Sequence, residues 1–79
     1  ACVNLLPGAQ SIYHWQGKVE SAPEVLGLFK TTEALLPEFE RALTELHPYE
    51  VPEIIAIRPD AVAGPYRAWL LESLRQDGL

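Results

Sequence analysis

The pattern of apolar residues divides the chain into two predicted strands, a helix, a third strand and a final helix. Residues 2–30 are rich in β-branched, aromatic and aliphatic side chains, and they predict one long hairpin with its turn at Gln16-Gly17. Pro7-Gly8 signals a bend in its first arm. From residue 24 to residue 30 the apolar side chains run almost continuously, which is typical of a strand buried on both faces.

Apolar residues at three- and four-residue spacing predict the first helix and the face that it turns toward the sheet. These residues are Leu35, Phe39, Ala42, Leu43 and Leu46. Thr31-Thr32 offers an N-cap, and Pro37 is tolerated only in or before the first turn of a helix. The helix is therefore expected to begin between Thr32 and Leu36. We expect it to end at Leu46 or His47.

The rest of the chain predicts one more strand and one more helix. Residues 53–58 form an apolar, β-branched run, residues 59–65 are a loop rich in Pro, Gly and Ala, and residues 66–76 show helical spacing. The predicted order is β-β-α-β-α. No repeat or low-complexity tract interrupts it, so residues 1–79 are expected to form a single domain.

Composition limits how such a chain becomes stable and what it binds. It has 79 residues, a formal net charge of −5 and one cysteine. A chain this small buries only about 60% of its unfolded surface, and it has no internal disulfide, so oligomerisation is the expected support. The acidic balance argues against a nucleic-acid partner. No apolar run approaches the roughly 20 residues of a membrane span, and a lone thiol fits a reducing, cytoplasmic location.

The densest chemistry lies between the first helix and the third strand, in residues 47–57. Pro48 and Pro52 hold this connector extended, and an imidazole, a phenol and two carboxylates lie around them. His47 either closes the helix with a local hydrogen bond or ligates a metal. Cys2 is either a small buried apolar residue or a soft thiolate ligand. His14 is expected on the surface.

No catalytic constellation is visible in the sequence. Glu50 and Glu53 lie three residues apart in extended chain and therefore face opposite ways, which disfavours a paired-carboxylate site. The HxH, CxxC and HExxH spacings of strong zinc sites are absent. A binding function is favoured over an enzyme.

Several ordered motifs together resemble the CutA family of divalent-cation tolerance proteins. They are Ala1-Cys2-Val3-Asn4, Leu6-Pro7-Gly8, Ser11-Ile12-Tyr13 with Trp15-Gln16-Gly17, Lys30-Thr31, residues 47–57, and Tyr66 with Trp69. The resemblance implies an α+β, ferredoxin-like sandwich of pattern β-α-β-β-α-β, with an antiparallel sheet and helices on one face. It further implies that the family's first strand and helix precede Ala1, so that the domain is N-terminally incomplete here, and that the protein is a homotrimer.

The resemblance also implies a function and a set of residues for it. Family members bind copper, so His47, Cys2 and Glu53 become candidate ligands of Cu²⁺, and the protein becomes a small trimeric binding module for divalent-cation tolerance. The alternative is a PII-like signalling trimer that binds a small anion or nucleotide between subunits. The residues expected to line that pocket are Trp15, Lys30, Tyr49, Glu50 and Trp69.

Overall fold

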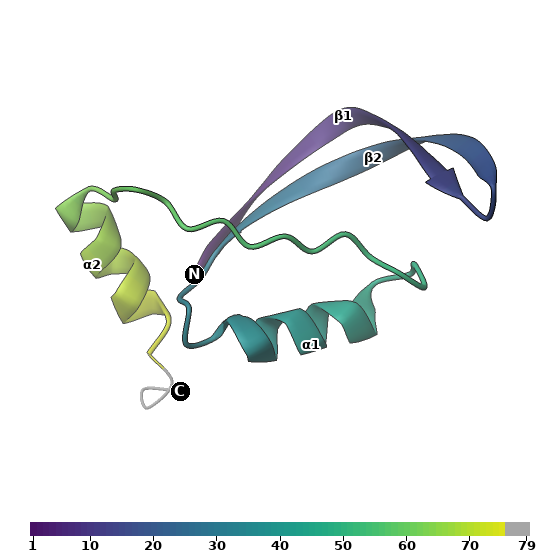
Figure 1. Ribbon diagram of the computed structural model, residues 1–79. Helices are drawn as coiled ribbons and strands as arrows, with labels where there is room; N and C mark the ends of the chain where they lie inside the picture. The colour runs from purple at the N-terminus through teal and green to yellow at the C-terminus, as the bar shows by residue number, and fades with distance from the viewer. Residues whose placement is uncertain (76–79) are drawn as a thin grey trace.

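The first thirty residues form the predicted hairpin. The structure is a computed structural model that describes residues 1–75, in which β1 (Cys2–Trp15) pairs antiparallel with β2 (Lys18–Lys30) (Figure 1). Gln16 and Gly17 both have positive φ, 51° and 79°, which is the combination that a type I′ turn requires. The predicted turn is confirmed, and it sets the register of both strands.

The predicted bend is also confirmed. The pairing register shifts between Leu6 and Ala9, so β1 carries one extra residue there that β2 does not match. Gly8 has a φ of 90°, a conformation that side-chain-bearing residues rarely adopt. An irregularity of this kind bends the strand that contains it, and Figure 1 shows the hairpin arching along its length.

Helix α1 (Leu36–Leu46) has the predicted limits and packs on β2 through two aromatic rings. Pro37 lies in its first turn, and the ring centroids of Phe39 and Phe29 are 5.0 Å apart. A Cβ atom on Gly27 would come within 2.8 Å of Phe29 Cε1, so the glycine makes room for the ring that receives the helix.

The expectation that Leu46 faces the sheet is wrong. Its side chain is 83% exposed, whereas Phe39, seven residues earlier on the same side of α1, is half-buried. Figure 1 shows the base of the hairpin beside the start of α1, and Leu46 at the other end of the helix stays open to solvent.

The predicted strand at 53–58 does not form in the described chain. The segment runs extended but has no backbone partner, and the observed order is β-β-α-α with a two-stranded sheet. Its apolar side chains stay open to solvent, with Ile55 72% and Ile57 85% exposed. Arg58 pairs with Glu33 and ties the far end of the segment to the start of α1. A strand needs a neighbour, and residues 1–75 provide none at this position.

The last described element is helix α2 (Gly64–Ser73), which begins two residues before the predicted helix. Pro65 lies in its first turn, where its missing N–H costs nothing. The helix ends before the predicted limit at residue 76, which lies outside the described residues. No helix in the described part of the chain is long and apolar enough to cross a bilayer.

The described chain has no core of its own. None of its apolar side chains is fully buried, and even β2, expected to be covered on both faces, leaves Val25 59% and Leu28 52% exposed. The radius of gyration is 15.4 Å, against about 11.6 Å for a compact domain of this length. The accessible surface is 6840 Å², whereas a folded monomer of this mass exposes about 4,800 Å². The excess of about 2,000 Å² is the size of a large protein interface.

Candidate functional site

Two hollows lie at opposite ends of α1. The first, called here the Cys2 hollow, has a volume of about 320 Å³ and lies beside the start of the helix. Its walls are Ala1, Cys2, Phe29, Lys30, Thr31, Leu35, Glu38, Phe39 and Leu74. The second, called the His47 hollow, has a volume of about 390 Å³ and lies beside the end of the helix. Its walls are Gly8, Pro23, Glu24, Val25, His47, Pro48 and Tyr49.

In the Cys2 hollow the thiol is engaged by a tyrosine. Cys2 Sγ lies 3.4 Å from the Tyr66 hydroxyl oxygen, so the first strand residue contacts α2 across 64 positions of sequence. This hydrogen bond raises the pKa of Tyr66 above its usual value. The contact fixes where α2 meets the base of the hairpin.

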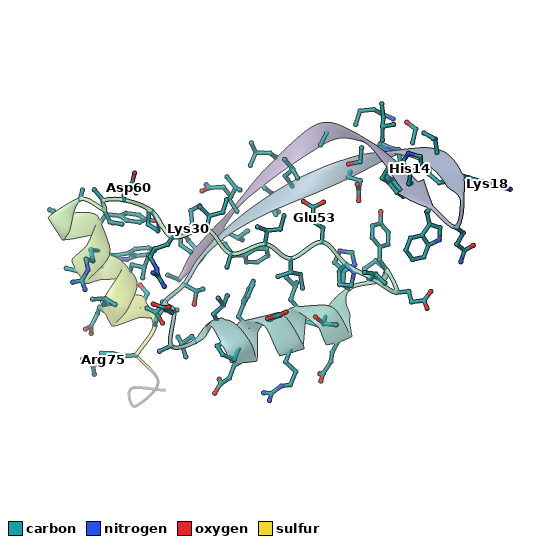
Figure 2. All side chains as sticks on the ribbon, in the orientation of Figure 1. His14, Lys18, Lys30, Glu53, Asp60 and Arg75 are labelled. Atoms are coloured by element: carbon teal, nitrogen blue, oxygen red, sulfur yellow. The ribbon has the colours of Figure 1, made fainter. Side chains whose placement is uncertain are left out.

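Lys30, predicted to line a ligand pocket, lies in the wall of the Cys2 hollow, beside the start of α1. Its Nζ donates to Asn4 Oδ1 and to the Leu28 carbonyl oxygen, the latter at 3.0 Å. Figure 2 shows Lys30 near the start of the chain and α2, at the opposite end of the hairpin from His14 and Lys18. The ammonium group is therefore held along the strand by protein acceptors.

In the His47 hollow one tyrosine, Tyr49, contacts two other residues, His47 and Glu24. The Tyr49 backbone N–H donates to His47 Nδ1 at 3.0 Å, and the two rings lie 4.8 Å apart. The Tyr49 hydroxyl donates to Glu24 Oε2 at 3.0 Å, which ties the connector to β2. The predicted local hydrogen bond of His47 is thus present, with its ring as the acceptor.

The carboxylate and the phenol of this hollow shift each other's pKa. A hydrogen bond from Ser11, and then one from Tyr49, hold the pKa of Glu24 below its usual value. The same Glu24 carboxylate raises the pKa of Tyr49, because an ionised phenol beside it would lose the hydrogen bond and meet a like charge. At neutral pH the hollow therefore contains an anionic Glu24 and a neutral Tyr49.

The structure separates most of the residues predicted to act together. Cys2 and His47 lie in different hollows, with the 11 residues of α1 between them, which is about 16 Å of helix. Glu53 lies on the extended segment and lines neither hollow, and Glu50 is exposed (Figure 2). Of the predicted ligands and pocket residues, His47 and Tyr49 meet at one hollow, and Cys2 and Lys30 line the other.

The aromatic pocket residues are similarly dispersed within one chain. Trp15 ends β1 at the hairpin turn, whereas the Trp69 ring lies on α2 with its centroid 5.7 Å from that of Tyr66. His14 lies at the hairpin tip and is exposed, as predicted (Figure 2).

Sequence reasoning missed Glu24 and Ser11. Both belong to the hairpin, and Glu24 is 25 residues away from the tyrosine that it contacts. No spacing rule joins such positions, because the contact depends on where the bend at Gly8 brings the strands. Among residues 1–75 there is no group of three or more His, Cys, Asp or Glu side chains placed to hold a metal. An ion in the His47 hollow would therefore have at most one imidazole and one carboxylate from the described chain.

The fold of the described residues identifies first a structural class and then a protein family. The structure is a small α+β protein of two antiparallel strands and two helices, and its structural neighbours assign it to the CutA/PII-like ferredoxin fold. It superposes on crystalline CutA1 from Pyrococcus horikoshii with a TM-score of 0.89 at 42% identity, covering 96% of this chain and 74% of that one. The family model of the CutA1 divalent ion tolerance protein matches residues 1–73. The chain belongs to this family.

Further relatives agree with this assignment. The divalent-cation tolerance protein CutA of Thermus thermophilus is 45% identical over 73 residues, which are 92% of this chain and 71% of that protein. A solved structure from Nostoc, described as a PII-like protein CutA in apo form, matches with a TM-score of 0.81 at 38% identity over 87% of this chain and 67% of that one. The chain spans only about 40% of the length of the curated cattle relative, which is 44% identical over 89% of this chain.

Proposed function

We propose that the protein binds a divalent cation, Cu²⁺, at the His47 hollow. The observation that supports this is the meeting of His47, Glu24 and Tyr49, an imidazole, a carboxylate and a phenol, beside one hollow in a family of divalent ion tolerance proteins. Imidazole is a preferred ligand of copper, and one carboxylate with water completes an open, adaptable site. The proposed role is binding in cation tolerance, without catalysis.

Calorimetric titration of the full-length protein with Cu²⁺ tests this proposal. The chain contains two histidines, so His14→Asn is a matched control for His47→Asn. Binding that is saturable in the wild type and in His14→Asn but strongly weakened in His47→Asn supports the proposal. Equal affinity in all three proteins contradicts it.

We further propose that the protein acts as a homotrimer in the cytoplasm. Two observations support assembly: large apolar side chains such as Ile12 and Val19 are 72% and 65% exposed, and the total accessible area exceeds that of a folded monomer of this mass by about 2,000 Å². Two unpaired hairpin edges add hydrogen-bonding groups that proteins normally cover. Light scattering of the full-length protein at micromolar concentration is expected to give three times the chain mass, and a monomer contradicts the proposal.

A second candidate function is a PII-like trimer that responds to a small anion or nucleotide. Two observations favour it, namely the relative described as PII-like and the position of Lys30 beside the Cys2 hollow. Trp15, at the hairpin turn, and Glu50, on the connector after α1, would reach such a pocket only from other subunits. Saturable nucleotide binding in the absence of metal, weakened by Lys30→Ala, supports this candidate, and its absence removes it.

A further inference from the structure

The hydrogen bond on His47 has a consequence for metal binding. Tyr49 N–H donates to Nδ1, so this nitrogen presents its lone pair to the tyrosine. A neutral imidazole has one protonated and one unprotonated nitrogen, and the ring proton is therefore on Nε2. A protonated nitrogen has no lone pair for a metal. With the 47–49 turn closed, neither nitrogen of His47 is available as a ligand.

The same tyrosine also occupies the carboxylate. Tyr49 Oη donates to Glu24 Oε2 at 3.0 Å, while its ring packs against that of His47 with centroids 4.8 Å apart. One residue thus blocks both groups of the hollow that suit a divalent cation. Because Tyr49 is about half exposed, its side chain has solvent to move into, which frees Glu24, and opening of the 47–49 turn at the backbone frees His47 Nδ1.

We propose that Tyr49 gates the His47 hollow, and that Glu24 becomes the second protein ligand of the cation once Tyr49 has moved away. This inference rests on the proposed function and names the ligand pair within it. The cation takes the lone pair on His47 Nδ1 in place of Tyr49 N–H, which passes to water, and Nε2 keeps its proton. No proton transfer or redox step is needed.

This proposal assigns opposite effects to two neighbouring substitutions. Tyr49→Phe removes the hydroxyl that holds Glu24 and leaves the backbone N–H in place. Copper affinity is expected to rise about three- to tenfold, the factor that corresponds to one net hydrogen bond. Glu24→Gln removes a ligand, and affinity is expected to fall by at least about tenfold.

Matched controls make the same chemical changes nearby. Tyr13→Phe removes a hydroxyl from β1, and Glu20→Gln removes a charge from β2, and neither residue lines the His47 hollow. Both variants are expected to bind Cu²⁺ within about twofold of wild type. Calorimetric titration of the full-length protein, with a thermal melt of each variant, gives all five affinities and shows which variants are folded.

The outcomes separate this inference from the proposed function. Absence of copper binding in the wild type, or binding unaffected by His47→Asn, overturns both. Weakened binding in His47→Asn together with unchanged or weaker binding in Tyr49→Phe overturns the gate alone. Unchanged copper affinity in Glu24→Gln would show that the Glu24 carboxylate is not a ligand of the cation. Tighter copper binding in Tyr49→Phe together with weaker copper binding in Glu24→Gln supports Tyr49 as the gate and His47 and Glu24 as the ligand pair.

Discussion

The Cys2 hollow and the His47 hollow are built alike and differ in one respect. In each, a side chain that can bind a metal is hydrogen-bonded to a tyrosine, Cys2 to Tyr66 and His47 to Tyr49. Tyr66 engages only the thiol, whereas Tyr49 also binds the Glu24 carboxylate from β2. In the His47 hollow one tyrosine therefore joins an imidazole and a carboxylate, whereas Glu38 in the wall of the Cys2 hollow shares no described hydrogen bond with Cys2 or Tyr66.

This difference shows how the fold separates the candidate metal ligands in space. Helix α1 holds the two hollows at its opposite ends, so a thiolate and an imidazole of one chain cannot share an ion. The bend in β1 at Gly8 lies beside Glu24 and the connector that follows α1, and it brings a carboxylate to the imidazole instead. The account therefore assigns cation binding to one hollow and a packing contact to the other.

The largest expected effect is the loss of copper binding on His47→Asn. Substituting even the outer partners of a metal ligand weakens binding about 10–100-fold, so loss of the imidazole is expected to weaken it by at least about 100-fold. Cys2→Ser is expected to leave the affinity unchanged. Titration with Cu²⁺ measures both. Loss of binding in Cys2→Ser with retention in His47→Asn would reverse the roles of the two hollows.

The next effect concerns the helix that separates the hollows. Phe39→Ala removes the ring that packs on Phe29, and because Phe39 is only half-buried in this chain we expect a loss of about 1–2 kcal/mol of unfolding free energy, below the range for full core sites. Leu46→Ala is expected to change it by less than about 0.5 kcal/mol, as for other exposed positions. Chemical denaturation of the full-length protein compares them. Equal losses would mean that another chain covers Leu46.

A smaller effect sharpens the contrast between the two tyrosines. Tyr66→Phe removes the hydroxyl that contacts Cys2, the same atomic change that Tyr49→Phe makes at the His47 hollow. Copper affinity in Tyr66→Phe is expected to stay within about twofold of wild type, since a thiol hydrogen bond is weak and the thiol is not the ligand. A tighter complex in both variants would show that the effect is not specific to the His47 hollow.

The smallest effect is the pH dependence of the Tyr49–Glu24 contact. Folding lowers the pKa of Glu24, so its contribution is present above the unfolded value near 4.3 and is lost as pH falls through the folded value. Folding raises the pKa of Tyr49, so its contribution is present below about pH 10 and is lost as pH rises through the folded value. The melting temperatures of wild type and Tyr49→Phe should differ most between these limits. A constant difference from pH 3 to 11 contradicts this.

The sequence predicted the local elements well because their signals are local. Gln16-Gly17 specifies the hairpin turn, Pro7-Gly8 specifies the bend, and Pro37 limits where α1 can begin. Residues 53–58 have equally strong strand character, but a strand depends on a partner that residues 1–75 do not provide. The prediction that Leu46 packs against the sheet was wrong for the same reason, because it too depends on a neighbour in space.

The candidate site was predictable only in part. The connector from His47 to Tyr49 stood out through its prolines and its concentration of polar groups, and the structure places both residues at one hollow. Glu24 did not stand out, because only the strand register and the bend bring it to Tyr49. Its ligand role and that of His47 stay predictions, as do those of Cys2 and Glu53.

Electron paramagnetic resonance of the Cu²⁺-loaded full-length protein tests the central claim most directly. Nitrogen coupling from a coordinated imidazole reports whether a histidine ligates the ion, and this chain offers only His47 and His14. The account predicts imidazole coupling in the wild type and in His14→Asn, and its loss in His47→Asn. Coupling that persists in His47→Asn, or that disappears in His14→Asn, would contradict the assignment of the cation to the His47 hollow.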